Sequence, residues 1–237
     1  MNTFDTLELI RKTKGSCVLS LIDPDSKNDS HLLQIIKKAN NSIFDGILVG
    51  GSNISDNNFE ERVKIIKNKS TRPIMLFPGS YKQITPLIDT ILYLNLISGR
   101  NPKYLIEEHV DGAMLINKHN LHTVPTAYIL LDGGSKTSVQ KISKTIPLNM
   151  SDMDIVLSHA LAGQYLGNKL IYFDCGSGSI NNMNTALLRY ISKKIKIPIM
   201  VGGGVNTKND INLLIDSGAS YVVVGNVLED FSKQTLF

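Results

Sequence analysis

Eight short runs of apolar, largely β-branched residues recur along this chain of 237 residues, and they constrain its fold more than any other feature. Each run is nearly continuous in apolar residues, without regular alternation with polar ones. Such short continuous runs are typical of parallel strands that are buried on both faces. The predicted strands are Cys17–Ile22, Gly46–Val49, Pro73–Phe77, Gly112–Ile116, Ala127–Leu131, Leu170–Phe173, Pro198–Val201 and Tyr221–Val224.

Apolar residues at helical spacing lie between these runs. Strands that alternate with helices form right-handed βαβ units and assemble into an α/β fold. Eight units in one chain favour a closed (β/α)8 TIM barrel, which needs about 250 residues, over an open sheet. We therefore expect a single TIM-barrel domain over 1–237, least regular at Asn95–Val110. The predicted helices are Ser30–Asn40, Phe59–Asn68, Thr85–Leu96, Ser151–Leu166, Asn182–Lys194, Thr207–Ser217 and a short last one at Leu228–Phe237.

The composition argues against several classes of protein. Hydrophobic residues make up 42% and charged residues 19%, so the chain can bury a core. The charge of +4 lacks the basic stripe, interleaved with aromatic residues, that nucleic-acid binding requires. No signal peptide is recognisable and no run reaches the ~18 apolar residues of a membrane span, so we expect at most peripheral membrane contact. The two cysteines, Cys17 and Cys175, indicate a cytoplasmic protein without a disulfide framework.

Glycine and small polar residues follow most of the predicted strands, at the barrel end that carries active sites. The last three strand ends are the most informative, namely Tyr172–Gly178, Gly202–Asn206 and Val224–Asn226. Barrel enzymes often bind phosphate there, because unpaired N–H groups attract an anion and glycine lets the backbone approach it. Neither a Walker A motif nor a G-x-G-x-x-G motif occurs. These loops predict a phosphate site of a kind that sugar-phosphate isomerases and other barrel enzymes share.

Asp23 and Ser52 follow the first two predicted strands, which are neighbours in a barrel, so we expect their side chains to lie close together. Mg²⁺ prefers oxygen ligands and commonly combines one or two carboxylates with waters and substrate phosphates. The pair is too small for a closed structural site but sufficient for Mg²⁺ that a diphosphate completes. Asp23, or more naturally Asp25, would otherwise cap the following helix. No His and Cys cluster indicates zinc.

Taken together, these motifs resemble the geranylgeranylglyceryl phosphate synthase family, which includes the bacterial heptaprenylglyceryl phosphate synthases. The resemblance extends from about Gly15 to Asp230. Each motif is weak by itself, and the specificity lies in their order and spacing. The motifs are Leu21-Ile22-Asp23-Pro24-Asp25, Ile47-Leu48-Val49-Gly50-Gly51-Ser52, Phe77-Pro78-Gly79-Ser80, Ser98-Gly99-Arg100-Asn101-Pro102, Pro125-Thr126-Ala127-Tyr128, Tyr172-Phe173-Asp174-Cys175-Gly176-Ser177-Gly178, Val201-Gly202-Gly203-Gly204 and Val224-Gly225-Asn226.

The resemblance implies a prenyltransferase of ether-lipid synthesis. Its substrates would be sn-glycerol 1-phosphate and a polyprenyl diphosphate, with geranylgeranyl diphosphate as the expected donor, and the glycerol C3 hydroxyl would form an ether with release of diphosphate. Mg²⁺ would be held by Asp23, Ser52 and the diphosphate. Family members are commonly dimers or hexamers, so we expect a homo-oligomer. The residues implied to bind glycerol 1-phosphate are Tyr172, Phe173, Asp174, Cys175, Gly176, Ser177, Gly178, Gly203, Gly204, Gly225 and Asn226.

Asp174 is the natural candidate to orient or deprotonate the attacking hydroxyl. The family pattern has Tyr-Leu-Glu where this chain has Tyr172-Phe173-Asp174, so the carboxylate is one methylene shorter. Arg100 is a candidate to contact the diphosphate, although a surface position explains it equally well. The prenyl tail needs an apolar groove, and ordinary helix packing competes with that role at every position. The candidate groove residues are Leu92, Tyr93, Leu96, Tyr104, Leu105 and Ile106.

Two other functions stay open on the residues alone. A phosphate-binding barrel isomerase or lyase would share the loops at Gly203–Gly204 and Gly225–Asn226, but would more often place a lysine or paired carboxylates at the strand ends. A non-catalytic binder of phosphate or lipid on the same barrel is favoured only by the shorter carboxylate of Asp174. Metal-dependent turnover separates the synthase from the non-catalytic binder.

Overall fold

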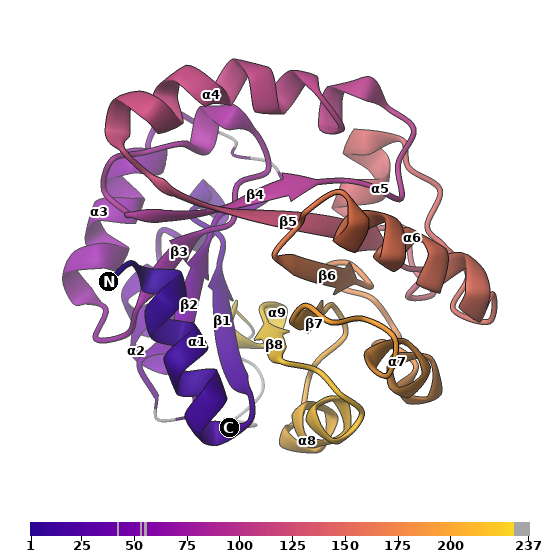
Figure 1. Cartoon of the computed structure of the whole chain (residues 1–237). Coiled ribbons are helices and arrows are strands. Elements are labelled where there is room, and N and C mark those ends of the chain that lie inside the picture. Colours follow the sequence, from indigo (N-terminus) through magenta and orange to yellow (C-terminus); the bar gives the residue numbers. More distant parts are fainter. Residues whose placement is uncertain (42, 53, 55, 230–237) are drawn as a thin grey trace.

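The computed structural model describes residues 1–41, 43–52, 54 and 56–229, which form a closed barrel of eight parallel strands surrounded by helices (Figure 1). Each strand pairs with the next one in sequence, and the last strand pairs with the first. The predicted (β/α)8 barrel is therefore confirmed. The strands are β1 (Cys17–Ile22), β2 (Gly46–Val49), β3 (Ile74–Leu76), β4 (Thr90–Asn95), β5 (His122–Leu130), β6 (Leu170–Asp174), β7 (Ile199–Gly202) and β8 (Tyr221–Val224).

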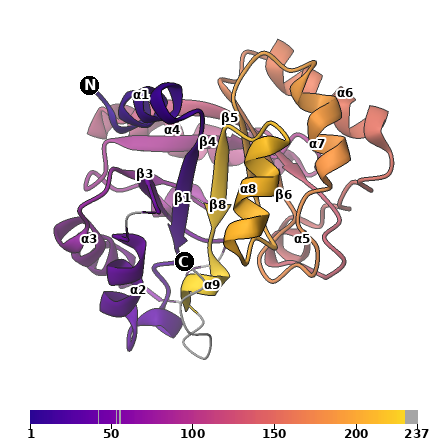
Figure 2. The ribbon, with the colours of Figure 1, turned by 90° about the horizontal axis from the view of Figure 1, so that it is seen from below.

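Helices α2, α3, α6, α7 and α8 lie around the outside of the barrel (Figure 2), and the sequence predicts all five to within a few residues. The last predicted helix overlaps α9, and its residues 230–237 lie outside the described part of the chain. Helices α1, α4 and α5 are additions to the predicted set. No helix in the described residues is long and apolar enough to cross a membrane. The helices are α1 (Thr3–Lys14), α2 (Leu32–Ala39), α3 (Phe59–Lys69), α4 (Glu107–His119), α5 (Ser138–Ser143), α6 (Met153–Tyr165), α7 (Thr185–Ser192), α8 (Lys208–Asp216) and α9 (Asn226–Glu229).

The strands are buried on both faces, which explains why their apolar runs are continuous. Alternate side chains such as Leu19 and Leu48 point into the barrel, while their neighbours Val18 and Ile47 pack against the helices. Leu7 of α1 has no exposed surface and packs with the interior residues, so α1 closes the N-terminal end of the barrel. The opposite, C-terminal end carries the pocket described below.

The fourth strand differs from the prediction. Thr90–Asn95 forms β4, where the apolar stripe over Thr85–Leu96 predicts a helix, and the predicted strand Gly112–Ile116 lies inside α4. Both predictions were wrong for one reason. A short apolar run suits either structure, and its partners decide between them. Strand β4 pairs with β5 along all six of its residues, and this ladder satisfies its backbone N–H and C=O groups.

Helix α4 buries few of its residues. Gly112 is its one buried residue, whereas Val110 is 67% and Met114 75% exposed. Acidic residues in its first turn and basic residues in its last turn complement the helix dipole. The segment expected to be least regular, Asn95–Val110, contains the 3-10 helix η3 (Pro102–Tyr104) and the start of α4. Residues of α4 and β4 together line part of the pocket described below.

Candidate active site

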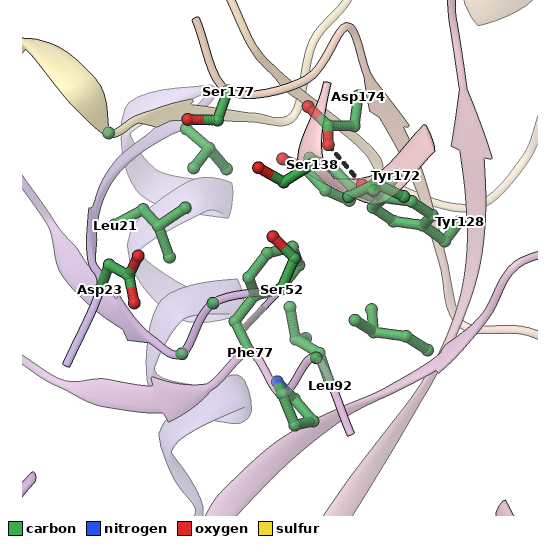
Figure 3. Close-up of a pocket in the computed structure, with 18 of the residues that line it drawn as sticks. Leu21, Asp23, Ser52, Phe77, Leu92, Tyr128, Ser138, Tyr172, Asp174 and Ser177 are labelled. Atoms are coloured by element: carbon green, nitrogen blue, oxygen red, sulfur yellow. Dashed lines mark hydrogen bonds between the residues drawn. The ribbon is translucent and has the colours of Figure 1, made fainter. Parts of the chain in front are cut away.

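A pocket of about 260 Å³ opens at the C-terminal end of the barrel (Figure 3). All eight strands, or the loops directly after them, contribute residues to its wall. One part of the wall consists of carboxylates and glycine-rich loops, and another consists of apolar side chains from β4, α4 and η3. The strand ends that the sequence singles out therefore surround a single cavity.

Strand β6 directs Tyr172 and Asp174 into this pocket, because alternate residues of a strand point to opposite faces. Asp174 is 7% exposed, and its carboxylate accepts hydrogen bonds from the hydroxyl of Tyr128 and, at 2.7 Å, from the N–H of Gly176. Burial raises the pKa of the Asp174 carboxyl, and the two hydrogen bonds act in the opposite direction. The remaining lone pairs can accept a substrate hydroxyl, and a raised pKa brings the group nearer to the range in which it exchanges protons efficiently.

Tyr128 is the partner of Asp174 that the sequence analysis did not assign to the site. It is paired with Tyr172 in the register of β5 and β6, and the two rings lie 5.2 Å apart between centroids. The Tyr172 ring also meets Phe77 edge-on at 5.4 Å. Burial raises the pKa of both tyrosines well above the ordinary value, so Tyr128 is a neutral hydrogen-bond donor at working pH. Its inward direction follows from strand alternation once the register is known.

Phe173 and Cys175 face the other side of β6. Both are fully buried in the layer between the strands and the helices, and neither lines the pocket. Burial raises the pKa of the Cys175 thiol, which keeps it protonated and unreactive. Gly176 donates its N–H to Asp174 and is likewise absent from the described lining. Of the implied substrate-binding segment, these three residues offer no side chain to the cavity.

The loops after β6, β7 and β8 meet on one wall of the pocket. Gly203 has φ +81°, and a Cβ at this position would lie 2.5 Å from the Gly176 nitrogen and 2.9 Å from Asp174 Oδ1, so only glycine fits. The Ser177 hydroxyl donates to Asn226 Oδ1 at 2.8 Å and joins the first loop to the third. Backbone amides and neutral donors of this kind suit a phosphate group. The other predicted residues on this wall are Gly178, Gly204 and Gly225.

Asp23 and Ser52, the two predicted metal ligands, both line the pocket (Figure 3). The Asp23 carboxylate lies against Gly51, where a Cβ would be 2.5 Å from Oδ1. Oδ1 is buried without a hydrogen-bond partner, and Oδ2 pairs with the Lys27 ammonium at 2.9 Å. Burial raises the pKa of Asp23, and Lys27 acts to lower it. Within the described residues no group of three or more His, Cys, Asp or Glu side chains is arranged to hold a metal. The unpartnered carboxylate oxygen of Asp23, in a pocket that Ser52 also lines, fits Mg²⁺ that takes its other ligands from water and substrate.

An apolar arm of the pocket lies between β4 and α4. The Tyr93 ring packs edge-on against the His109 ring at 4.6 Å, and its hydroxyl donates to the His109 carbonyl at 2.9 Å. Burial lowers the pKa of His109, so this ring is neutral at pH 7. Leu105 and Ile106, two of the predicted groove residues, do not line the cavity, and Ile106 is 61% exposed. The predicted groove residues that do line it are Leu92, Tyr93, Leu96 and Tyr104.

Arg100 lies outside the described lining of the pocket. Its guanidinium is exposed and donates to the carbonyl oxygens of Gly99 at 2.6 Å and Ile97 at 3.3 Å. Arg100 is therefore a loop-stabilising residue in this structure. Among the described lining residues, Lys27 is the one lysine or arginine, and the sequence pattern did not single it out.

The comparison with protein families matches residues 9–236 to the PcrB family. The geranylgeranylglyceryl phosphate synthase of Flavobacterium johnsoniae is 40% identical over 222 residues, which cover 93% of this chain and 91% of that protein. The geranylgeranylglyceryl phosphate synthase of Thermoplasma acidophilum is 32% identical and covers 94% of this chain and 88% of its own length.

Solved structures agree with this assignment. The crystal structure of (S)-3-O-geranylgeranylglyceryl phosphate synthase from Thermoplasma acidophilum, in complex with its substrate sn-glycerol-1-phosphate, superposes with a TM-score of 0.84 at 29% identity, covering 97% of this chain and 92% of that one. The wild-type enzyme from Thermoplasma volcanium superposes with a TM-score of 0.87 at 28% identity and the same coverage. The resemblance drawn from the motifs is confirmed, and the chain belongs to the PcrB family.

Proposed function

We propose that this protein transfers a polyprenyl group, with geranylgeranyl as the expected one, from its diphosphate to the C3 hydroxyl of sn-glycerol 1-phosphate. The observation that carries the proposal is a single pocket in which a glycine-rich wall, an apolar arm and the Asp174 carboxylate meet. A small phosphate ester and a long apolar diphosphate need both walls at once. The names of the relatives, and the glycerol phosphate bound to one of them, support the same reaction.

Asp174 is the proton acceptor in this proposal. The C3 oxygen attacks C1 of the prenyl chain, the bond between C1 and the diphosphate oxygen breaks, and the hydroxyl proton passes to the carboxylate. Tyr128 and Gly176 fix the carboxylate through their hydrogen bonds, so that it faces the cavity in one orientation. The side chain is shorter than the glutamate of the family pattern, yet it lines the pocket directly.

Glycerol 1-phosphate is proposed to bind at the loops after β6, β7 and β8. Backbone amides of these glycine-rich loops would hold the phosphate, and Ser177 and Asn226 would add neutral donors. Tyr172 shares its wall of the pocket with Asp174 and would contact the glycerol. This arrangement leaves the C3 hydroxyl near Asp174 and the apolar arm free for the prenyl tail.

We further propose that Asp23 and Ser52 hold Mg²⁺. The buried, unpartnered Oδ1 of Asp23 supports this role, because a carboxylate oxygen without any partner is costly in a buried site. When bound, Mg²⁺ neutralises the negative charge of the departing diphosphate. Asp23 and Ser52 would hold the ion at the end of the pocket formed by β1 and β2.

A homo-oligomer, either a dimer or a hexamer, is proposed from the surface of α4. Val110 and Met114 of α4, and Ile106 at its N-cap, are more than 60% exposed and recur every four residues, so they form an apolar row along one side of the helix. Light scattering coupled to gel filtration measures the assembly directly, and a monomer at micromolar concentration would refute it.

Both cysteines are free and buried, which favours the cytoplasm as the location.

The reaction is tested with labelled sn-glycerol 1-phosphate and farnesyl, geranylgeranyl or heptaprenyl diphosphate, each with Mg²⁺ or with EDTA. We expect a lipid-soluble ether with geranylgeranyl diphosphate that disappears with EDTA and forms about a hundredfold or more slowly in Asp174→Asn. Asp174→Glu, which restores the family residue, is the matched control and is expected to keep activity. Product from heptaprenyl diphosphate alone would mean that heptaprenyl, and not geranylgeranyl, is the group transferred. No product with any donor would refute the proposed reaction.

A further inference from the structure

The pocket has few cations for the charge that it must receive. Its described lining contains four carboxylates, Asp23, Glu108, Asp174 and Glu229, and one ammonium, that of Lys27. The proposed reaction brings in a phosphate and a diphosphate, both strongly anionic. Bringing anions toward unneutralised carboxylates is unfavourable, and the cost grows as water is excluded. A lysine in this wall is therefore placed to act on the substrates.

Lys27 lies where the loops after β1 and β8 meet. Its Nζ is 2.9 Å from Asp23 Oδ2 and 3.4 Å from Glu229 Oε2, and 54% of its side chain is exposed. The 3-10 helix η1 (Ser26–Asn28) that carries it is capped by Asp25, the alternative capping role expected from the sequence. The exposed ammonium leaves a donor free for a further anion, since lysine has three.

The Asn28 side chain connects the loop after β1 to helix α9. Its amide donates to the Asp23 carbonyl at 2.8 Å and to Glu229 Oε1 at 2.9 Å, so it joins the loop after β1 to a residue that lies 201 positions after Asn28. Glu229 thereby has a partner for each carboxylate oxygen, Asn28 on one and Lys27 on the other. The two carboxylates that pair with Lys27 therefore belong to residues that Asn28 holds together, and the ion pairs place the ammonium at the pocket wall beside the proposed metal ligand.

We propose that Lys27 binds the diphosphate group of the prenyl donor, an inference that rests on the proposed function of the pocket. Asp23 is the proposed Mg²⁺ ligand, and Mg²⁺ in such a site takes phosphate oxygens of the substrate. A diphosphate that reaches Mg²⁺ on Asp23 comes within range of an ammonium that lies 2.9 Å from the same carboxylate. The glycerol phosphate, in contrast, has the neutral glycine, serine and asparagine donors of the loops after β6 to β8.

Lys27 has a second effect through Glu229. Without the ammonium, no cationic side chain would neutralise the Glu229 carboxylate beside the incoming diphosphate, whereas Asp23 would still hold the proposed Mg²⁺. Removal of Lys27 therefore takes away one attraction and exposes one repulsion. Both changes act on the donor and leave the binding of glycerol 1-phosphate nearly unchanged.

The test compares Lys27→Met and Lys27→Arg with Lys14→Met. Lys14 has a comparable exposure of 51% and pairs with Asp45 at 2.6 Å, but it lies at the N-terminal end of the barrel, so it controls for the loss of one paired lysine. The KM is measured separately for the prenyl diphosphate and for glycerol 1-phosphate. Inhibition by inorganic pyrophosphate, with Mg²⁺ at saturation, gives a readout that does not depend on the tail.

In Lys27→Met we expect the KM for the donor and the inhibition constant for pyrophosphate to rise about tenfold or more, the scale of a lost charge-assisted hydrogen bond, with the KM for glycerol 1-phosphate within about twofold. Lys27→Arg should restore most of both values, and Lys14→Met should match the wild type. A rise in the KM for glycerol 1-phosphate alone, or unchanged pyrophosphate inhibition, overturns the inference. If the wild type forms no ether, direct titration of pyrophosphate into the wild type and Lys27→Met still tests this lysine, so that failure of the reaction and failure of the inference are told apart.

Discussion

Replacement of Tyr128 by Phe is the most direct test of how the carboxylate in the site is controlled. The substitution removes a single hydroxyl, the donor to Asp174 Oδ2, and keeps the ring that packs against Tyr172 at 5.2 Å. Asp174 then retains the Gly176 N–H as its donor among the contacts described here. The buried carboxylate loses stabilisation of its charged form, so its pKa rises further above the ordinary value.

The size of the effect follows from the type of hydrogen bond that is lost. A hydrogen bond to a charged group contributes about 1.5–3 kcal/mol, and a pH unit corresponds to about 1.4 kcal/mol. If the ionised carboxylate accepts the hydroxyl proton, the acid limb of kcat/KM for glycerol 1-phosphate moves up by roughly one to two pH units. At a pH below the acid limbs of both proteins, the activity of Tyr128→Phe is about ten- to a hundredfold lower than that of the wild type, and at high pH the difference largely disappears.

The assay is kcat/KM for glycerol 1-phosphate between pH 5 and 9 for the wild type and Tyr128→Phe, with the donor and Mg²⁺ at saturation. Thermal unfolding of both proteins at each pH shows whether the fold is retained. An acid limb that stays in place, or that moves to lower pH, refutes the reasoning. A loss of activity that is equal at every pH would mean that Tyr128 acts on the substrate and not through Asp174.

Three further substitutions test other parts of the site. Asp23→Asn should raise the Mg²⁺ concentration for half-maximal activity by on the order of a thousandfold, because two unit charges about 4 Å apart at an effective dielectric constant of about 20 attract each other by about 4 kcal/mol, and an unchanged Mg²⁺ titration would contradict the metal site. Gly203→Ala should lower kcat/KM for glycerol 1-phosphate about tenfold or more, because strain at a left-handed position costs about 1–3 kcal/mol, whereas Gly15→Ala, at φ +90° with nothing within 4 Å, should leave it unchanged. Asp174→Asn should lower kcat about a hundredfold or more and yet raise the urea midpoint at pH 8. The folded state binds the Asp174 proton more tightly than the unfolded state, so the native protein loses stability as pH rises from the ordinary carboxyl pKa through the raised one, and the amide avoids this loss. A lower midpoint would refute that sign.

The sequence alone determined the fold class and the end of the barrel at which the site lies. Buried parallel strands need apolar residues on both faces, so their pattern survives in one dimension, and seven of the eight strands overlap their predicted runs. The glycines after β7 and β8 and the acidic residue after β1 are also local signals. They mark turns and strand ends, whose positions follow from chain order once the barrel is assumed.

Tertiary pairing decided the rest. Residues 90–95 form a strand, and residues 112–116 lie in a helix, because β4 pairs with β5. No local sequence pattern reveals this pairing. Strand register decided which residues near the end of β6 face the pocket. Asp174 faces it and Cys175 does not, and Tyr128 lies beside Asp174. Lys27 and Glu229 are 3.4 Å apart in space although nearly the whole chain separates them. Contacts of this kind depend on three-dimensional closure of the barrel, because side chains distant in sequence meet only where strands and loops are brought together.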